Sequence, residues 1–248
     1  MAEAGRHSLR AAMLLAAGLG LRMRPITEKT PKPLVQVAGR TLIDMCLDRV
    51  AASGIGKAVV NTHYLAGQVE AHLKRRPDLD IVISHEPELL GTGGGVANAL
   101  PHLGDEPFLV VNTDSLWLDG PSPAIERLAL NFDESMMDAL LLMHSTVEAY
   151  GYEGAGDFVI DAGGLLSRRP EREQVPYAYT GVMVVHPRLL AGAPGGAFSF
   201  NLLYDRAIEA ERLYGIVHDG EWFHVGTTDG LDQVEDYMSE RFPGIRHR

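Results

Sequence analysis

The chain has 248 residues, of which 46% are hydrophobic, so it is long enough to bury the core of one α/β domain. Its formal net charge of -11 argues against a surface that binds nucleic acid, because such a field repels a polyanion. No run of residues approaches the roughly 20 apolar residues that a membrane span needs. A phosphate ligand would therefore have to be held by a local cluster of basic side chains.

Cys46 is the single cysteine, which excludes an intramolecular disulfide and a zinc site built from thiolates. A reducing, cytoplasmic setting is expected. The apolar run at 11–17 has the length of a short signal-peptide core, but Gly18, Gly20 and Arg22 follow it instead of a cleavage site. We interpret this run as a buried strand.

The first half of the chain alternates short apolar runs with amphipathic stretches, which is typical of βαβ units. The apolar runs predict strands at 12–17, 57–62, 80–84 and 108–112. The amphipathic stretches predict helices at 41–52, at 65–74, and from about Gly95 to before Pro101.

The second half has a more irregular texture. Pro121 and Pro123 precede an expected helix, further strands are expected at 138–144 and 179–185, and several glycines interrupt the interval between them. We expect one domain over 1–248, with a first half at about 11–114 and a more irregular second half at about 115–230 that carries substrate contacts. Residues 1 to about 10 and the tail from Phe242 are expected to fray.

A loop with two glycines and two arginines follows the first strand. Gly18 and Gly20 allow close approach of a polyphosphate to the backbone, and Arg22 and Arg24 offer charged forks. The dinucleotide fingerprint fails, because Met23 stands where a third glycine is required, and no Gly-Lys-Ser or Gly-Lys-Thr follows. The alternative is a tight turn with surface arginines.

Two further charged positions support phosphate chemistry. Pro31 and Pro33 bracket Lys32 and fix the backbone that carries its ammonium group. The strand at 108–112 leads to Asp114, which places a carboxylate at the sheet edge where α/β proteins gather ligands. Magnesium prefers one or two carboxylates together with phosphate oxygens and water, so Asp114 is the expected first ligand of Mg²⁺. A helix cap is the alternative role for Asp114.

The pattern Leu-Ala-Ala-Gly-x-Gly-x-Arg-x-x-Pro from Leu15, followed by Pro-Lys-Pro, resembles the signature of the sugar-1-phosphate nucleotidyltransferases. The resemblance implies a Rossmann-like mixed sheet flanked by helices, with a smaller sugar-binding lobe. It implies transfer of a nucleoside monophosphate from an NTP to a sugar 1-phosphate, with release of pyrophosphate. In this reaction Arg22 contacts the NTP phosphates and Lys32 bridges the α-phosphate and the sugar phosphate. The remaining nucleotide contacts expected in this loop are Ala17, Gly18, Gly20 and Arg24.

The segment 85–95 places three adjacent glycines at the entry of a helix. In the family this loop lies over the nucleobase, and a flexible helix entry is the alternative. The carboxylate of Glu86 could accept from guanine N1/N2 or from uracil N3, which leaves the base open. The positions expected to contact the base or line the loop are Glu86, Gly91, Thr92 and Gly93.

The segment 221–227 resembles the family's Trp-x-Asp-x-Gly-Thr, except that His224 stands where the family supplies its second metal-binding carboxylate. Neutral imidazole is a poorer partner for magnesium than a carboxylate. Four roles are open for His224: direct ligation of the metal, contact with it through water, contact with phosphate as imidazolium, and simple packing.

The expected sugar contacts are Asn112, Asp157, Thr180 and Gly181, placed by the same resemblance. Arg168 and Arg169 lie near the position of the family's Glu-Lys-Pro lysine and are candidates for the sugar phosphate.

The chain contains Thr-Gly-Gly-Gly at 92–95, Asn-x-Asp at 112–114, Gly-Asp-Phe at 156–158 and His-Pro at 186–187. With these motifs it resembles, along nearly its whole length, the short N-acetylmuramate 1-phosphate uridylyltransferases of peptidoglycan recycling, without room for a C-terminal β-helix. The resemblance implies a nucleotide-binding half at about 11–114 and a sugar-binding half at about 115–230. The alternatives are a mannose 1-phosphate guanylyltransferase and a non-catalytic sugar-nucleotide sensor. Monomer and homo-oligomer both remain open.

Overall fold

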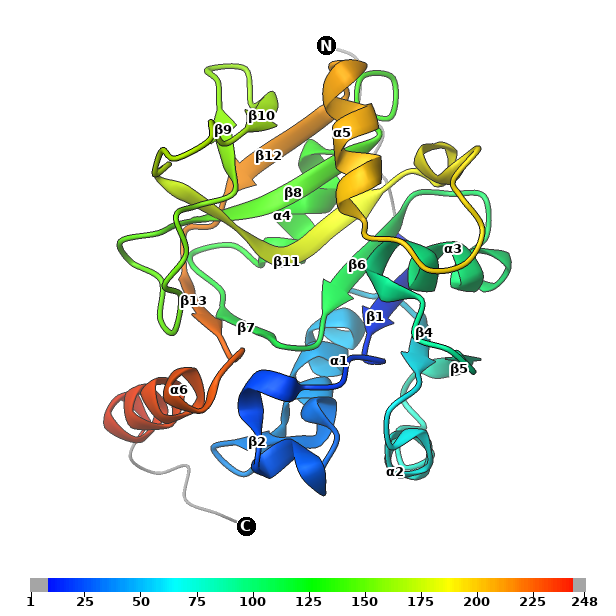
Figure 1. Ribbon diagram of the computed structural model, residues 1–248, viewed down its shortest axis with the longest axis vertical. Coiled ribbons are helices and arrows are strands. Elements are labelled where there is room, and N and C mark those ends of the chain that lie inside the picture. Colours follow the sequence, from blue (N-terminus) through cyan, green and yellow to red (C-terminus); the bar gives the residue numbers. More distant parts are fainter. Residues whose placement is uncertain (1–8, 243–248) are drawn as a thin grey trace.

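A computed structural model describes residues 9–242, which fold around a nine-stranded mixed sheet (Figure 1). The main strands, from one edge to the other, are β5 (Asp80–His85), β4 (Lys57–Thr62), β1 (Ala11–Leu15), β6 (Phe108–Asn112), β11 (Tyr177–Val185), β8 (Ala139–Ser145) and β12 (Leu213–Val217). The hairpin of β9 (Phe158–Ile160) and β10 (Leu166–Arg168) continues the sheet beside the start of β11.

The strand directions bring several strand ends to one edge of the sheet. Strands β1, β4, β5 and β6 are parallel, whereas β11 is antiparallel to β6 and β8. In the register of β1 with β6, Leu15 lies opposite Asn112. The loops that leave these parallel strands therefore meet at their carboxyl ends, where ligands bind in open α/β sheets.

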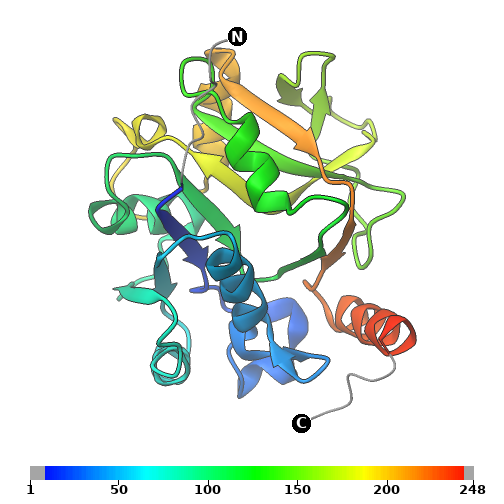
Figure 2. The same ribbon diagram turned by 180° about the vertical axis from the view of Figure 1, so that it is seen from behind.

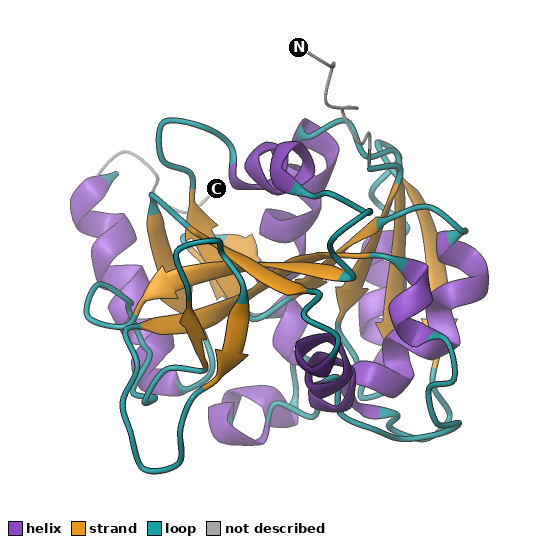
Figure 3. Cartoon of the chain, turned by 90° about the horizontal axis from the view of Figure 1, so that it is seen from above, coloured by secondary structure: helices purple, strands orange, loops and turns teal. Residues whose placement is uncertain are grey.

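Helices cover both faces of the sheet (Figures 1, 2 and 3). Because successive side chains of a strand point to opposite faces, Leu14 and Val60 pack in one core and Met13 and Val59 in the other. The first core is shared with α1 (Leu42–Ala52), α2 (Ala66–Leu73) and α4 (Ala124–Asn131). The second core is shared with α3 (Gly91–Leu103) and α5 (Asn201–Glu209).

A separate two-stranded sheet joins distant parts of the chain. Strand β7 (Ser115–Leu118), which follows β6, pairs with β13 (Glu221–His224), and α6 (Thr228–Arg241) follows β13. A third apolar cluster packs Phe223 and Val234 against Met23 and Val35. The short elements of this region are β2 (Gln36–Val37), β3 (Arg40–Thr41) and the 3-10 helices Leu21–Met23, Ile26–Glu28 and Lys32–Leu34; another 3-10 helix, Pro187–Leu190, follows β11.

The predicted strands at 57–62 and 108–112 are confirmed, but the first strand ends at Leu15 rather than at residue 17. The prediction for the third helix was wrong, because α3 begins at Gly91 and runs through Pro101 to Leu103. The carbonyl of Phe198 accepts from the N–H groups of Gly93 and Gly94, at 3.0 and 3.1 Å, and so caps the earlier start. Pro101 lies in the last turns, where its missing N–H removes a single helical hydrogen bond.

Of the residues expected to fray, 1 to about 10 and from Phe242 onward, those at 1–8 and 243–248 lie outside the described part of the chain, whereas Leu9 is buried in the core. Within 9–242, no helix combines the length and the apolar character that crossing a membrane requires.

Candidate active site

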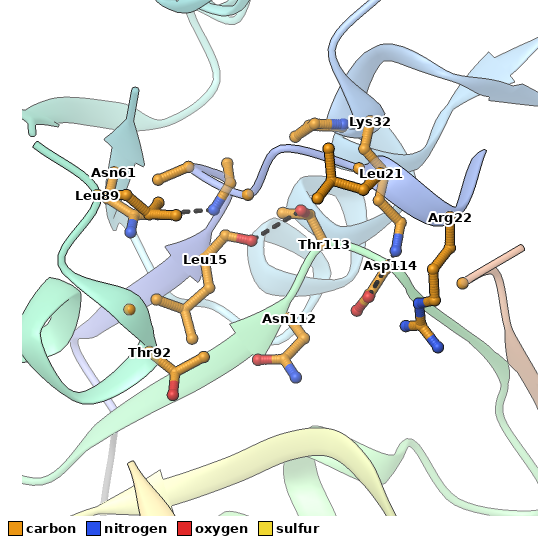
Figure 4. Close-up of a pocket in the computed structure, with 17 residues that line it drawn as sticks. Leu15, Leu21, Arg22, Lys32, Asn61, Leu89, Thr92, Asn112, Thr113 and Asp114 are labelled. Carbon is orange, nitrogen blue, oxygen red and sulfur yellow. Dashed lines mark hydrogen bonds and ion pairs between the residues drawn. The ribbon is translucent and has the colours of Figure 1, made fainter. Parts of the chain in front are cut away.

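A pocket of about 460 Å³ opens at the carboxyl edge of the parallel strands (Figure 4). Its walls come from the loop after β1, from the segment around Lys32, from the ends of β4 and β6, and from the start of α3. The structure brings together many of the residues singled out from the sequence, namely Ala17, Gly18, Gly20, Arg22, Lys32, Gly91, Thr92, Asn112 and Asp114.

Lys32 and Asp114 form an ion pair at one end of the pocket, with 2.7 Å between Nζ and Oδ2. Burial raises the pKa of Asp114, but the charge of Lys32 and the hydrogen bond from Lys32 outweigh this effect, so the pKa lies below its usual value. The carboxylate is therefore ionised at neutral pH and keeps the ammonium group of Lys32 directed into the pocket.

His224 lies near Asp114 because β13 pairs with β7. His224 is opposite Ser115 in this register, and the N–H of Val225 donates to the carbonyl of Asp114 at 3.0 Å. Burial lowers the pKa of His224. The positive charges of Lys32 and Arg22 lower this pKa further, whereas the charge of Asp114 raises it. The imidazole is thus mainly neutral at pH 7, which is the form that binds a metal ion through a ring nitrogen.

Gly226 is where Arg22 and His224 come together. A Cβ atom at this position would lie 2.2 Å from His224 Nε2 and 3.1 Å from Arg22 Nη2. Gly226 itself lines the pocket. The missing side chain therefore makes room for the imidazole and the guanidinium group beside the Lys32–Asp114 pair.

The glycine loop is shaped by Gly20, whose φ of 64° is left-handed. A Cβ atom there would meet Thr27 Cγ2 at 2.9 Å, and the Thr27 hydroxyl donates to the Gly20 carbonyl at 2.7 Å. The loop is thereby folded back toward Lys32. Arg24 is exposed and does not line the pocket, so this structure places it apart from the other phosphate candidates.

Glu86, expected from the sequence to contact a base, lies inside the chain and does not line the pocket. Glu86 is fully buried, its Oε1 accepts from Asn61 Nδ2 at 2.7 Å, and its Oε2 accepts from the N–H of Leu90 at 3.0 Å. Gly93 is also buried and does not line the pocket; its N–H donates to Phe198. Glu86 and Gly93 both form hydrogen bonds within the protein, because the loop before α3 packs against β4 and against Phe198.

Of the sugar candidates, Asn112 lines both the pocket and a smaller adjoining cavity of about 240 Å³. Thr180 lines neither cavity: its buried hydroxyl donates to the Leu142 carbonyl at 2.8 Å, and its carbonyl accepts from Trp222 Nε1 at 3.1 Å. The hydroxyl ties β11 to β8, the backbone carbonyl ties β11 to β13, and the residue is only 1% exposed.

Gly181 has a left-handed φ of 88°, and a Cβ atom there would lie 2.5 Å from Ser115 Oγ. Its role in this structure is close packing beneath Asn112. Asp157 lines neither cavity; its Oδ2 accepts from the N–H of Tyr179 at 2.8 Å, and burial raises its pKa.

Arg168 and Arg169 are both directed elsewhere. Arg168 pairs with Asp205 at 2.7 Å and lies over the ring of Phe158, while Arg169 donates to the Glu173 carbonyl. Among the residues 9–242, the cations that line the pocket are Arg22 and Lys32. The charge of a polyphosphate would therefore be neutralised at the end of the pocket where Arg22 and Lys32 lie.

The sequence reasoning missed several lining residues, of which Asn61, Leu21, Leu89 and Gly226 matter most. Asn61 carried a usable signal, because it is a polar residue near the end of an apolar strand whose carboxyl end lies at the ligand edge. Leu21 and Leu89 carried none, since an exposed leucine in a loop is common.

Comparisons with known proteins agree with this geometry. A sequence model of the nucleotidyl transferase family matches residues 11–240. The chain is 43% identical to the N-acetylmuramate alpha-1-phosphate uridylyltransferase of Caulobacter vibrioides, covering 92% of this chain and 97% of the relative. It is 35% identical to the protein of that name from Neisseria meningitidis serogroup B, covering 90% and 96%. A solved UDP-glucose pyrophosphorylase complexed with UDP-glucose superposes with a TM-score of 0.77 over 94% of this chain and 99% of that one; at 15% identity this likeness concerns the fold alone.

Proposed function

The chain belongs to the nucleotidyl transferase family, and we propose that it transfers the uridylyl group of UTP to N-acetylmuramate α-1-phosphate, forming UDP-N-acetylmuramate and pyrophosphate. The observation that carries the choice of substrates is the 43% identity to the Caulobacter enzyme over 97% of its length. We assign the nucleotide to the half at about 11–114 and the sugar to the half at about 115–230.

The proposed reaction is an in-line displacement at the α-phosphorus of UTP. An oxygen of the sugar 1-phosphate forms a bond to this phosphorus, and the bond to the β-phosphate oxygen breaks, with both electrons leaving on pyrophosphate. The attacking oxygen is already anionic, so no general base is needed. The work of the protein is to position the two substrates and to neutralise their charge.

Arg22 and Lys32 are the residues that perform this neutralisation in the proposal. Both line the pocket, and the ion pair with Asp114 holds Lys32 in place before substrate arrives. A guanidinium fork suits the phosphate oxygens of the nucleotide, whereas the compact ammonium of Lys32 suits the point between the two substrates. The smaller adjoining cavity shares Leu15, Thr92 and Asn112 with the pocket and is available for the sugar.

Magnesium is the metal that the family resemblance implies, so we compare the side chains near Asp114 with the ligands that Mg²⁺ prefers. Among residues 9–242 no group of three or more His, Cys, Asp or Glu is placed to hold a metal ion. Magnesium commonly takes one or two protein carboxylates and completes its shell with substrate phosphates and water. Asp114 meets that need together with bound UTP, and neutral His224 is an additional candidate. When bound there, Mg²⁺ would supply Lewis-acid charge neutralisation at the phosphates.

The proposed setting is peptidoglycan recycling in the cytoplasm. The proposed substrate supports a role in peptidoglycan recycling, because N-acetylmuramate is a component of peptidoglycan. The single free thiol, that of buried Cys46, is compatible with a reducing compartment.

A pyrophosphate-release screen tests the proposal. UTP, GTP, dTTP, CTP and ATP are each combined with the 1-phosphates of N-acetylmuramate, mannose, glucose and N-acetylglucosamine, in the presence of Mg²⁺. We expect the highest kcat/KM for UTP with N-acetylmuramate α-1-phosphate. Turnover restricted to GTP with mannose 1-phosphate would replace the uridylyl assignment, and NTP binding without release from any pair would identify a sensor.

A further inference from the structure

Asn61 connects two walls of the nucleotide pocket, although it is only 2% exposed. Its Oδ1 accepts from the N–H of Ala16 at 2.6 Å, in the loop that leaves β1. Its Nδ2 donates to Glu86 Oε1 at 2.7 Å, at the start of the loop that leads into α3. The oxygen and the nitrogen of the side-chain amide therefore each have a partner on a different wall of the pocket.

Glu86 continues the same chain of hydrogen bonds. Its Oε2 accepts from the N–H of Leu90 at 3.0 Å, and its backbone N–H donates to the Thr62 carbonyl at 2.8 Å. Its carbonyl faces His63 Nδ1 at 2.9 Å. An uninterrupted path thus runs from Ala16 through Asn61 and Glu86 to Leu90, and the backbone at both ends borders the pocket.

Helix α3 holds the Asn61–Glu86 pair against the sheet. A Cβ atom on Gly95 would lie 2.7 Å from Asn61 Nδ2 and 2.8 Å from Glu86 Oε1. The pair therefore has no free space to shift toward the helix. In Figure 4, Asn61 and Leu89 lie together on the side of the pocket away from Asp114 and Arg22.

We propose that Asn61 and Glu86 are positioning residues that set the separation of the two loops receiving the nucleoside of the NTP. Neither side chain reads the base. They hold the backbone at Ala16–Ala17 and at Leu90–Gly91 in a preformed slot, so that the nucleotide does not bear the cost of ordering it. The inference rests on the proposed NTP site, and it places these residues in nucleotide affinity rather than in the transfer step at Lys32 and Asp114.

The arrangement of donors and acceptors offers a test by exchange. In Asn61→Asp two carboxylate oxygens would meet where a 2.7 Å hydrogen bond now lies. In Glu86→Gln the new amide nitrogen would face either Asn61 Nδ2 or the N–H of Leu90, so one donor meets another donor. In the double variant all three hydrogen bonds can form again. The carboxylate introduced at position 61 accepts from Ala16 and from the amide nitrogen introduced at position 86, and the oxygen of that amide accepts from Leu90.

We expect each single variant to raise the KM and the Kd for UTP by about tenfold, which is the effect of losing one buried hydrogen bond. The kcat and the KM for the sugar 1-phosphate should stay within about threefold of wild type. The double variant should return the UTP affinity to within about threefold of wild type. Gly95→Ala presses on both atoms without changing charge and should weaken UTP binding in the same way. Asn98→Asp is the matched control, because Asn98 lies on α3 but donates to Ser84, outside the pocket.

Binding of UTP is measured by calorimetry without sugar phosphate, and folding is checked by the melting temperature. Unchanged UTP affinity in the folded single variants, or losses that add up in the double variant, would overturn the inference. If Asn61→Asp does not fold, Glu86→Gln, its reversal in the double variant and Gly95→Ala decide the question. Wild-type binding of UTP without turnover of any pair would instead contradict the proposed reaction and leave this inference standing.

Discussion

Gly226→Ala should reduce activity strongly while leaving the fold nearly intact. The new Cβ atom would lie 2.2 Å from His224 Nε2, whereas an ordinary contact begins near 3.4 Å, so the imidazole has to move by roughly 1 Å or displace Arg22, whose Nη2 lies 3.1 Å away. Both atoms are at the ends of side chains, and Gly226 lacks a left-handed backbone, so the cost to stability is small. A displacement of roughly 1 Å at the reacting phosphates costs on the order of 100-fold in kcat/KM.

The assay is steady-state pyrophosphate release, with thermal melting measured in parallel. Gly67→Ala on α2 is the control, since its Cβ atom meets nothing within 4 Å. In a His224→Ala background the Gly226→Ala substitution should cost much less, because the nearest clash is gone. If Gly226→Ala remains within about threefold of wild type, or costs the same in both backgrounds, the arrangement of Arg22 and His224 at the phosphates is refuted.

Three other changes test separate parts of the structure. Thr180→Val should lower the free energy of unfolding by about 1 kcal/mol, because the hydrogen bond to Leu142 is lost. The KM for the sugar 1-phosphate should stay unchanged. A raised KM without destabilisation would instead indicate that Thr180 contacts the sugar. Burial and nearby His144 lower the pKa of His218 below that of an unfolded histidine, so the unfolded chain binds more protons. Stability should therefore fall as the pH drops through about 6.5 toward the lower pKa of the folded state; urea unfolding of His218→Gln should show a smaller loss, and an equal loss would contradict this cause. If His224 helps to hold Mg²⁺, titration of activity with Mg²⁺ should show tighter dependence in His224→Asp and weaker dependence in His224→Ala, whereas unchanged curves for both remove it from the metal site.

The sheet was predictable where short apolar runs are bounded by clear breaks. The strands at 57–62 and 108–112 lie in the parallel part of the sheet, buried by helices on both faces, and this burial leaves an uninterrupted apolar signature. The start of α3 was not predictable, because glycines disfavour a helix unless a distant segment caps it, and here the cap is the carbonyl of Phe198. Local sequence contains no information about that contact.

The site was predictable where residue types matched both phosphate chemistry and the family signature, as with Arg22, Lys32 and Asp114. Asp114 reaches the pocket because the parallel strands end at one edge of the sheet, which the βαβ pattern indicated. Glu86 and Thr180 do not line the pocket, because a polar side chain can form its hydrogen bond with a neighbouring backbone group instead of facing the cavity. Asn61 escaped notice because its importance comes from two partners on separate loops.

The fate of the phosphates tests the central claim most directly. UTP labelled with ³²P at the α or at the γ position is incubated with Mg²⁺, N-acetylmuramate α-1-phosphate and either wild-type protein or Asp114→Asn. Transfer at the α-phosphorus predicts α label in the UDP-sugar and γ label in pyrophosphate, in equal amounts, with both lost in Asp114→Asn. The γ label in a sugar product, or its release as orthophosphate, would contradict nucleotidyl transfer at the Lys32–Asp114 centre.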